Sequence, residues 1–112
     1  MVAVYIGCLE TTSDCIAAAE RCAVTCGTFG NAERERCALF AHDCADIGRL
    51  LETLMLRHSR YASDACLLHA TACDDFVDYC AKWPHADCCR DAKKAARACA
   101  AACRAWVMQE AA

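Results

Sequence analysis

The chain has 112 residues, a net charge of −3 and 13 cysteines, with only four glycines and one proline. This length suits one domain with its own core, and we expect a single domain over residues 1–112. Mild charge and scattered basic residues exclude a typical nucleic-acid-binding face, and no run of 18 apolar residues indicates a membrane span. The N-terminus lacks the features of a signal peptide, which favours a cytoplasmic protein; an exported form with its signal removed is the alternative.

The first half of the chain predicts two helices. One covers residues 3–26, and Gly27 and Gly30 after it suit a left-handed backbone conformation. A later start, capped by Ser13 and Asp14, is the alternative; the earlier start is favoured because Cys8 is in phase with Cys15. Asn31 is a good N-cap for the second helix, which we expect to end near His58. Alanine is abundant throughout, which favours helix and close helix packing.

The second half predicts two further helices. Ser63 and Asp64 open the third, which must stop before Pro84. Asp87 can cap the fourth, which extends to about Met108. Connections this short predict an all-α fold, an antiparallel up-down-up-down four-helix bundle with a cysteine-lined core.

Twelve cysteines recur at spacings of seven, four and eleven residues on these helices. At about 100° per residue a step of seven drifts by only about 20°, so each helix presents a narrow stripe of thiols to the core. The twelve are Cys8, Cys15, Cys22, Cys26, Cys37, Cys44, Cys66, Cys73, Cys80, Cys88, Cys99 and Cys103. Cys89 lies about 100° from the stripe of the fourth helix, and we expect it outside the core.

The spacing argues against a disulfide scaffold. Residues seven apart on a helix are separated by about 10.5 Å along its axis, whereas a disulfide needs Cα atoms within about 7 Å. Free thiols in turn indicate a reducing compartment.

Thiolates prefer soft metals such as Cu(I), Zn(II) and iron–sulfur clusters. Zinc and iron–sulfur sites usually employ Cys-x-x-Cys elements, and this chain has none. Its two Cys-x-x-x-Cys pairs, Cys22/Cys26 and Cys99/Cys103, can each clamp an ion that accepts two ligands, as Cu(I) does. One monovalent ion per thiolate also leaves a buried thiolate core neutral. The pattern therefore predicts a store for several Cu(I) ions per chain.

The chain resembles the copper storage proteins over nearly its whole length. The resemblance rests on residues 37–46 (CALFAHDCAD), on Cys66-x₆-Cys73-x₆-Cys80, and on residues 84–88 (PHADC) followed by Cys99-x₃-Cys103. It implies Cu(I) bound along the lumen by thiolates, with histidine or methionine assisting near the open end. It also implies a homo-oligomer, since assemblies of several bundles, often tetramers, are usual in that family.

The two ends of the predicted bundle differ. One gathers Cys22, Cys26, Cys37, Cys80, Cys88 and the loop residue His85; the other gathers Tyr5, Leu51, Leu54, Met55 and Trp106 over Cys8, Cys66 and Cys103. We expect copper to enter at the thiol-rich end past His85 and the apolar end to be plugged.

For three groups of residues the sequence leaves more than one role open. His69 either completes a mixed Cys/His site or is a hydrogen-bonded edge histidine, and His85 either handles incoming metal or does not. His42 and His58 suit packing or surface roles. Met55 is either core filler or a soft ligand. Gly48, Val77, Ala92 and Ala95 occupy stripe positions where further cysteines would be plausible.

Copper storage without catalysis is the leading functional hypothesis, because no nucleophile–base pair with third-group support is visible. Copper ions are the expected partner, with a copper chaperone as a candidate for delivery. The alternatives are a thiol redox or sensor protein, and a thiolate site for zinc, cadmium or an iron–sulfur cluster.

Overall fold

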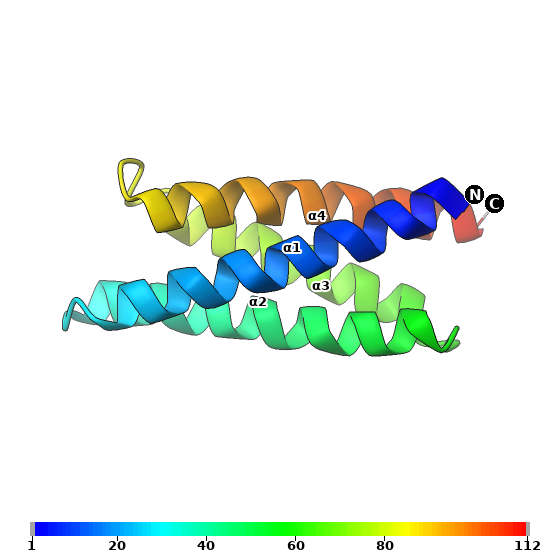
Figure 1. Cartoon of the computed structure of the whole chain (residues 1–112), viewed down its shortest axis with the longest axis horizontal. Helices are drawn as coiled ribbons and strands as arrows, with labels where there is room; N and C mark the ends of the chain where they lie inside the picture. Colours follow the sequence, from blue (N-terminus) through cyan, green and yellow to red (C-terminus); the bar gives the residue numbers. More distant parts are fainter. Residues whose placement is uncertain (1, 112) are drawn as a thin grey trace.

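The computed structural model describes residues 2–111, which form four helices and no strand. They are α1 (Val2–Gly27), α2 (Ala32–Leu56), α3 (Ala62–Cys80) and α4 (Asp87–Ala111). The helices run alternately up and down in a bundle measuring 45 × 20 × 17 Å, with both chain ends at the same end (Figure 1). The predicted all-α four-helix bundle is confirmed.

The helix boundaries agree with the turn chemistry at α2. The Asn31 side chain accepts a hydrogen bond from the Arg34 backbone N–H at 2.9 Å, so Asn31 is the N-cap. Gly30 has φ +70°, the left-handed conformation that glycine tolerates, whereas Gly27 stays in the last turn of α1. α2 ends at Leu56, and His58 turns the chain with φ 53°.

Two predicted caps are wrong. α3 begins at Ala62, before Ser63, and its N-cap residue Tyr61 makes no side-chain capping bond. Asp87 is the first residue of α4, and its carboxylate pairs with Arg90 at 2.6 Å. It contributes a negative charge to the first turn of α4, where the helix dipole favours one.

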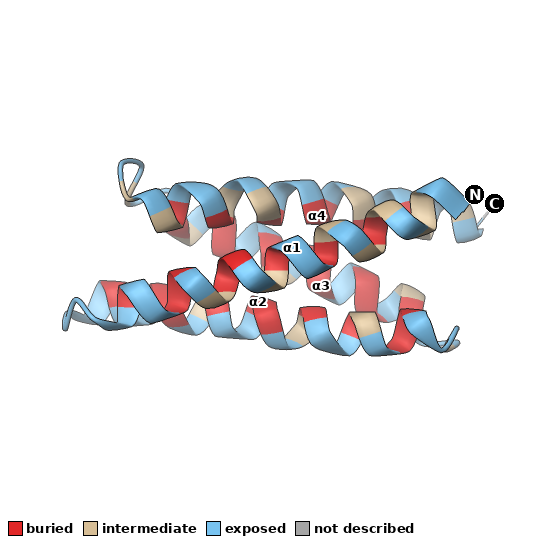
Figure 2. Ribbon diagram, viewed as in Figure 1, coloured by how far each residue is buried: buried red, intermediate tan, exposed pale blue. Residues whose placement is uncertain are grey.

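Neighbouring helices pack around the square: α1 on α2 and α4, and α3 on the same two helices. The buried residues follow one face of each helix and turn toward the bundle axis (Figure 2). Between the thiols this core is built mostly from alanine, whose small side chain lets the helices approach closely. The central space is thereby left to sulfur.

α1 alone among the described helices has the length and mean hydropathy, 1.2, of a membrane span. Core helices of bundles and signal sequences satisfy the same criterion. Here Cys8, Cys15, Cys22 and Cys26 on α1 are buried against the other helices.

Candidate metal centre

The thirteen cysteines are all free thiols, and all but Cys88 are buried. Their sulfurs form a column along the bundle axis, and within each of its levels the neighbouring Sγ atoms are 3.6–3.9 Å apart. A disulfide would bring two sulfurs to about 2.05 Å. The expectation of free rather than paired cysteines is therefore confirmed, and the column divides into three levels.

The first level lies at the end of the bundle where the chain begins. Cys8 is 3.9 Å from Cys66 and 3.8 Å from Cys103, sulfur to sulfur. Its thiol also donates to the Met55 Sδ at 3.7 Å. Above this level Tyr5 packs on Trp106 with ring centroids 6.2 Å apart and donates a hydrogen bond to the Met55 carbonyl at 2.8 Å.

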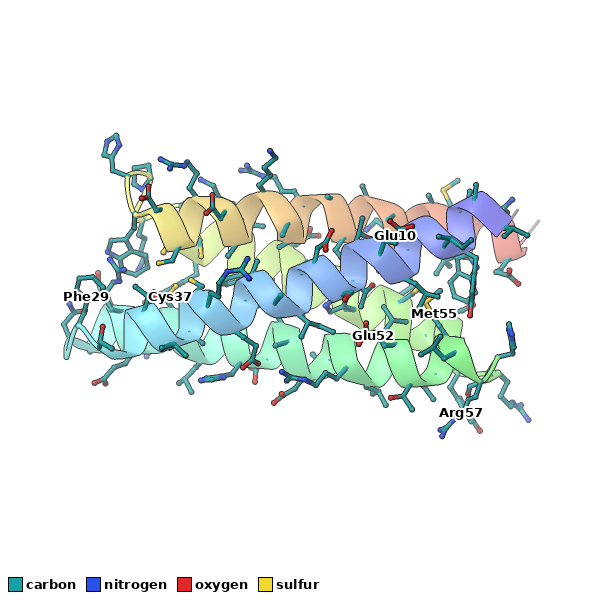
Figure 3. All side chains as sticks on the ribbon, viewed as in Figure 1. Glu10, Phe29, Cys37, Glu52, Met55 and Arg57 are labelled. Atoms are coloured by element: carbon teal, nitrogen blue, oxygen red, sulfur yellow. The ribbon has the colours of Figure 1, made fainter. Side chains whose placement is uncertain are left out.

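This apolar end is closed, as expected, but only by a thin layer. Outside it lies a cavity of about 700 Å³ that Tyr5, Met55, His58 and Trp106 help to line. Met55 is 1% exposed and separates that cavity from Cys8. Figure 3 places Met55 at this end, opposite Cys37 and Phe29.

The second level occupies the middle of the bundle. The sulfurs of Cys15, Cys44 and Cys73 form a triangle with sides of 3.7, 3.6 and 3.9 Å. Cys99 lies beside them and is 3.9 Å from Cys103, which connects this level to the first. Cys15 on α1 and Cys73 on α3 meet across the diagonal of the bundle.

His69 is fully buried at this middle level. Its Nε2 lies 3.1 Å from the Cys44 carbonyl, which can only accept, so Nε2 carries a hydrogen. Nδ1 lies 3.5 Å from the Cys99 sulfur. Burial opposes the imidazolium, but the hydrogen bonds to Cys44 and Cys99 outweigh it and raise the pKa of His69 to about 10. A soft metal ion could replace the proton that Nδ1 shares with Cys99.

The third level holds six sulfurs at the end with the two loops α1–α2 and α3–α4. Cys37 and Cys80 are 3.7 Å apart, and the Cys22/Cys26 pair is 3.8 Å apart. Two groups of four close sulfurs overlap here, Cys22/Cys37/Cys80/Cys89 and Cys22/Cys26/Cys88/Cys89. Cys22 and Cys89 belong to both groups.

The expectation that Cys89 lies outside the core is wrong. Cys89 is fully buried, 3.9 Å from both Cys22 and Cys26, whereas Cys88 is partly exposed. Helical phase explains this, because at about 100° per residue Cys89 lies about 40° from Cys103, whereas Cys88 lies about 60° from it. Cys89, Ala96 and Cys103 are one heptad apart and all buried, so the seven-residue register, not the eleven-residue step from Cys88 to Cys99, defines the inner face of α4.

Every level contains sulfurs that favour negative charge because neighbouring S–H groups donate to them, and the middle level contains two, Cys44 and Cys99, whose pKa values are lowered in this way. Hydrogen bonds from Cys103 and Cys66 lower the pKa of Cys8 to about 4. Hydrogen bonds, chiefly from Cys22, lower the pKa of Cys37 to about 3. The donors hold their protons more tightly; the bond to Cys37 raises the pKa of Cys22.

Gly48 is not a vacant cysteine position. A Cβ built on it would lie 2.8 Å from Ile16 Cγ1 and 3.1 Å from His69 Nε2. Gly48 therefore provides the room in which the His69 ring sits. Ala95, another proposed position, is only partly buried and lines a surface cavity, whereas Ala92 faces the core.

The remaining histidines lie outside the sulfur column. His85 is exposed on the α3–α4 loop, and no group of close ligand atoms among residues 2–111 includes it. His42 is exposed, and His58 stacks on Tyr5 with centroids 5.8 Å apart. The surface or packing role expected for His42 and His58 is thus confirmed.

Two polar residues beside the thiols were not predicted. Thr12 is fully buried, and its hydroxyl lies 3.4 Å from the Cys99 sulfur. Its position four residues after Cys8 and three before Cys15 could have shown that it shares their stripe. Arg34 is 7% exposed at the third level, and nothing in its local sequence distinguishes it from its exposed neighbour Arg36.

The sulfur column is arranged for several ions rather than one. A metal–thiolate bond of about 2.3 Å places three sulfurs around one ion about 4.0 Å apart. The observed separations of 3.6–3.9 Å are close to that value at every level. Metal can therefore bind between existing sulfurs with small side-chain adjustments and no movement of the helices.

Comparison with known proteins agrees with this geometry. The family model described as "Copper storage protein" matches residues 2–108. Among solved structures, the Cu(I)-bound copper storage protein BsCsp3 is similar, with a TM-score of 0.84 and 29% identity over 91% of this chain and 96% of that one. No curated protein matches the chain. The match over nearly the full length shows that the chain belongs to the copper storage protein family.

Proposed function

We propose that the protein binds and stores several Cu(I) ions per chain on the thiolates of its lumen. The observation that supports this most directly is the unbroken contact between sulfurs from Cys8 to Cys103 and Cys99, and again from Cys22 through Cys89 to Cys88. Copper can pass along such a series by exchanging one thiolate ligand for the next. The protein acts as a container and has no catalytic turnover.

The proposed ligands are the predicted twelve cysteines together with Cys89, and His69 through Nδ1. The twelve are Cys8, Cys15, Cys22, Cys26, Cys37, Cys44, Cys66, Cys73, Cys80, Cys88, Cys99 and Cys103. Each thiol that binds releases its proton, and its sulfur lone pair forms the bond to copper. One Cu(I) per thiolate neutralises the buried charge, which a divalent metal would overcompensate at that ratio.

Copper enters, in this proposal, at the third level. Cys88 is the one thiol of the column that is partly exposed, and it lies 3.9 Å from Cys89. His85, exposed on the adjacent loop, is suited to hold an incoming ion before it reaches Cys88.

An anaerobic titration of the reduced protein with Cu(I), against a competing chelator, tests the function. With thirteen thiols we expect saturation at about ten or more ions per chain. Saturation at one ion or none would contradict storage and would favour a thiol redox or sensor role. Zinc and cadmium titrated in parallel distinguish a general soft-metal site.

Single cysteine variants test the arrangement of the third level. Cys22→Ser removes a sulfur that both groups share, whereas Cys88→Ser removes one that belongs to a single group. We expect Cys22→Ser to lower the number of bound ions more than Cys88→Ser does. Equal losses would contradict the shared position of Cys22.

The remaining expectations extend the proposal. We place the protein in the cytoplasm, as a single domain over residues 1–112 that assembles as a homo-oligomer and receives copper from a copper chaperone. Exposed Leu39, Leu50 and Leu68 support subunit contacts. Sedimentation of the apo and loaded protein measures the assembly.

A further inference from the structure

Arg34 is the one permanently charged side chain buried within residues 2–111. It sits in the first turn of α2, where the helix dipole disfavours a cation, so neither exposure nor the helix explains it. Burying an unpaired charge costs several kcal/mol. Such a residue must be held by its surroundings or serve a partner that completes it.

Aromatic rings from both loops hold the guanidinium in place. Its central carbon lies 3.9 Å from the Phe29 ring centroid and 4.8 Å from the Trp83 ring centroid. Phe29 belongs to the α1–α2 loop and Trp83 to the α3–α4 loop, so the stack joins the two connections at this end. Trp83 is backed in turn by Tyr79, at 5.7 Å.

The stack satisfies the faces of the guanidinium but not its edge. Nε and Nη2 of Arg34 are buried and have no hydrogen-bond partner. None of the ion pairs formed by residues 2–111 involves Arg34. A guanidinium donates five hydrogen bonds and is always charged, so this edge is short of an anion.

The ring stack that holds Arg34 lies against the third level, since the Phe29 N–H donates to the Cys26 carbonyl at 3.3 Å and the Trp83 N–H donates to the Cys80 carbonyl at 3.0 Å. Burial opposes the charge of Arg34, but the adjacent Cys26, with Cys89 and Cys88 beyond it, raises its pKa. Burial and Cys37 raise the pKa of Cys26, and Arg34 opposes them. Among residues 2–111, no arginine or lysine is buried beside the first or middle level.

Copper binding at the third level should leave more thiolates than copper ions. Six sulfurs lie in two overlapping groups. Ions that take three ligands each leave more thiolates than copper even when every sulfur bridges two ions, so this level holds fewer ions than the one per thiolate that would neutralise it. Such a cluster is an anion, and it needs a nearby cation to be stable in a buried site.

Resting on the proposed storage function, we propose that Arg34 is the counter-charge of an anionic Cu(I)–thiolate cluster at the third level. When copper binds there, one thiol more than the number of ions loses its proton to solvent. The unpaired N–H groups of Arg34 then donate to thiolate sulfur, and no electron is transferred. Arg34 is a positioning residue that does not contact copper.

Three variants separate charge from packing. Arg34→Met keeps the length of the side chain and its contact with the rings but removes the charge, whereas Arg34→Lys keeps the charge. Arg36→Met, at an exposed position of the same helix, is the matched control for net charge. Each reduced protein is titrated with Cu(I) against a competing chelator under argon, in weak buffer that reports released protons.

Arg34→Met is expected to weaken the ions of the third level by about 10- to 100-fold, the usual effect of removing a partner behind a ligand. It should also release one proton fewer per chain at saturation. Arg34→Lys should recover most of both, and Arg36→Met should match the unaltered protein, since an exposed charge contributes little.

The stability of the apo proteins separates an effect of charge from an effect of packing, because a loss of packing alone would lower it. Removing an unpaired buried charge should leave the urea-unfolding free energy of apo Arg34→Met unchanged or higher. Wild-type copper affinity and proton count in Arg34→Met would overturn the proposal, as would an equal loss of affinity in Arg34→Met and Arg34→Lys. Saturation of the unaltered protein at one ion or fewer would instead overturn the storage function itself.

Discussion

The two ends of the bundle are closed by different chemistry. At one end Tyr5, Met55 and Trp106 form a neutral layer that is held by a hydrogen bond between Tyr5 and the Met55 carbonyl. At the other a cation, Arg34, lies between Phe29 and Trp83 beside six thiols, one of them partly exposed. The first arrangement is neutral and apolar, whereas the second combines a positive charge with a thiol within reach of solvent.

Few bulky apolar side chains lie between the sulfurs and water. The core between the ends is built mostly from alanine and thiol groups, and Phe76 and Leu51 are the largest of the few bulky side chains fully buried in it. The apo bundle therefore has a weaker apolar core than its helix length suggests. Copper binding should compensate for this, most strongly where the thiols are most numerous.

Copper removal should produce the largest effect. An ion present at 1,000 times its dissociation constant adds about 4 kcal/mol to stability, and about 1 kcal/mol shifts the midpoint by 4–8 °C in a chain of this size. Several ions should raise the unfolding temperature by more than about 20 °C in anaerobic calorimetry. Copper should slow amide exchange more around Cys26 than around Leu51. Equal slowing at the two ends would contradict the difference between them.

Met55→Ala should breach the apolar end. Truncating a buried methionine costs about 2–5 kcal/mol, and here it also removes the side chain between the outer cavity and Cys8. Chelator should then remove copper faster than from the unaltered protein. Met108→Ala, at an exposed methionine, is the control, and equal release rates in the two variants would contradict the role of Met55 as a plug.

Gly48→Ala tests the middle level between the two ends. The added methyl group would meet Ile16 at 2.8 Å and His69 at 3.1 Å, an overpacking that typically costs about 1–3 kcal/mol. Gly7→Ala is the matched control, since nothing lies within 4 Å of its added Cβ and alanine is favoured in a helix by about 0.5–1 kcal/mol. Urea unfolding should therefore give opposite signs for the two substitutions.

Tyr5→Phe should have the smallest effect. It keeps the ring against Trp106 and removes only the hydrogen bond to the Met55 carbonyl, which contributes about 1 kcal/mol. Copper capacity should not change. A capacity loss in Tyr5→Phe would mean that the apolar end takes part in binding rather than only closing the lumen.

Much of the fold and the site could be predicted from sequence because both depend on periodicity. Cysteines seven apart must share a helical face, and the Asn31 cap and the Gly30 turn are local signals. The predicted contents of the two ends followed from antiparallel order alone. Periodicity restricted the expected metal to soft ions, and the family resemblance then indicated copper.

The sequence alone could not predict the role of residues that depend on contacts with another helix. Cys89 lies inside because the face of α4 that packs against α1 and α3 is centred nearer Cys89 than Cys88. His69 occupies the middle level because Gly48 on α2 leaves space for its ring. Arg34 is buried because rings from two loops meet over it, a contact between residues 29, 34 and 83. Helical phase, a local property, determined the stripes; distances between helices decided which polar groups join them.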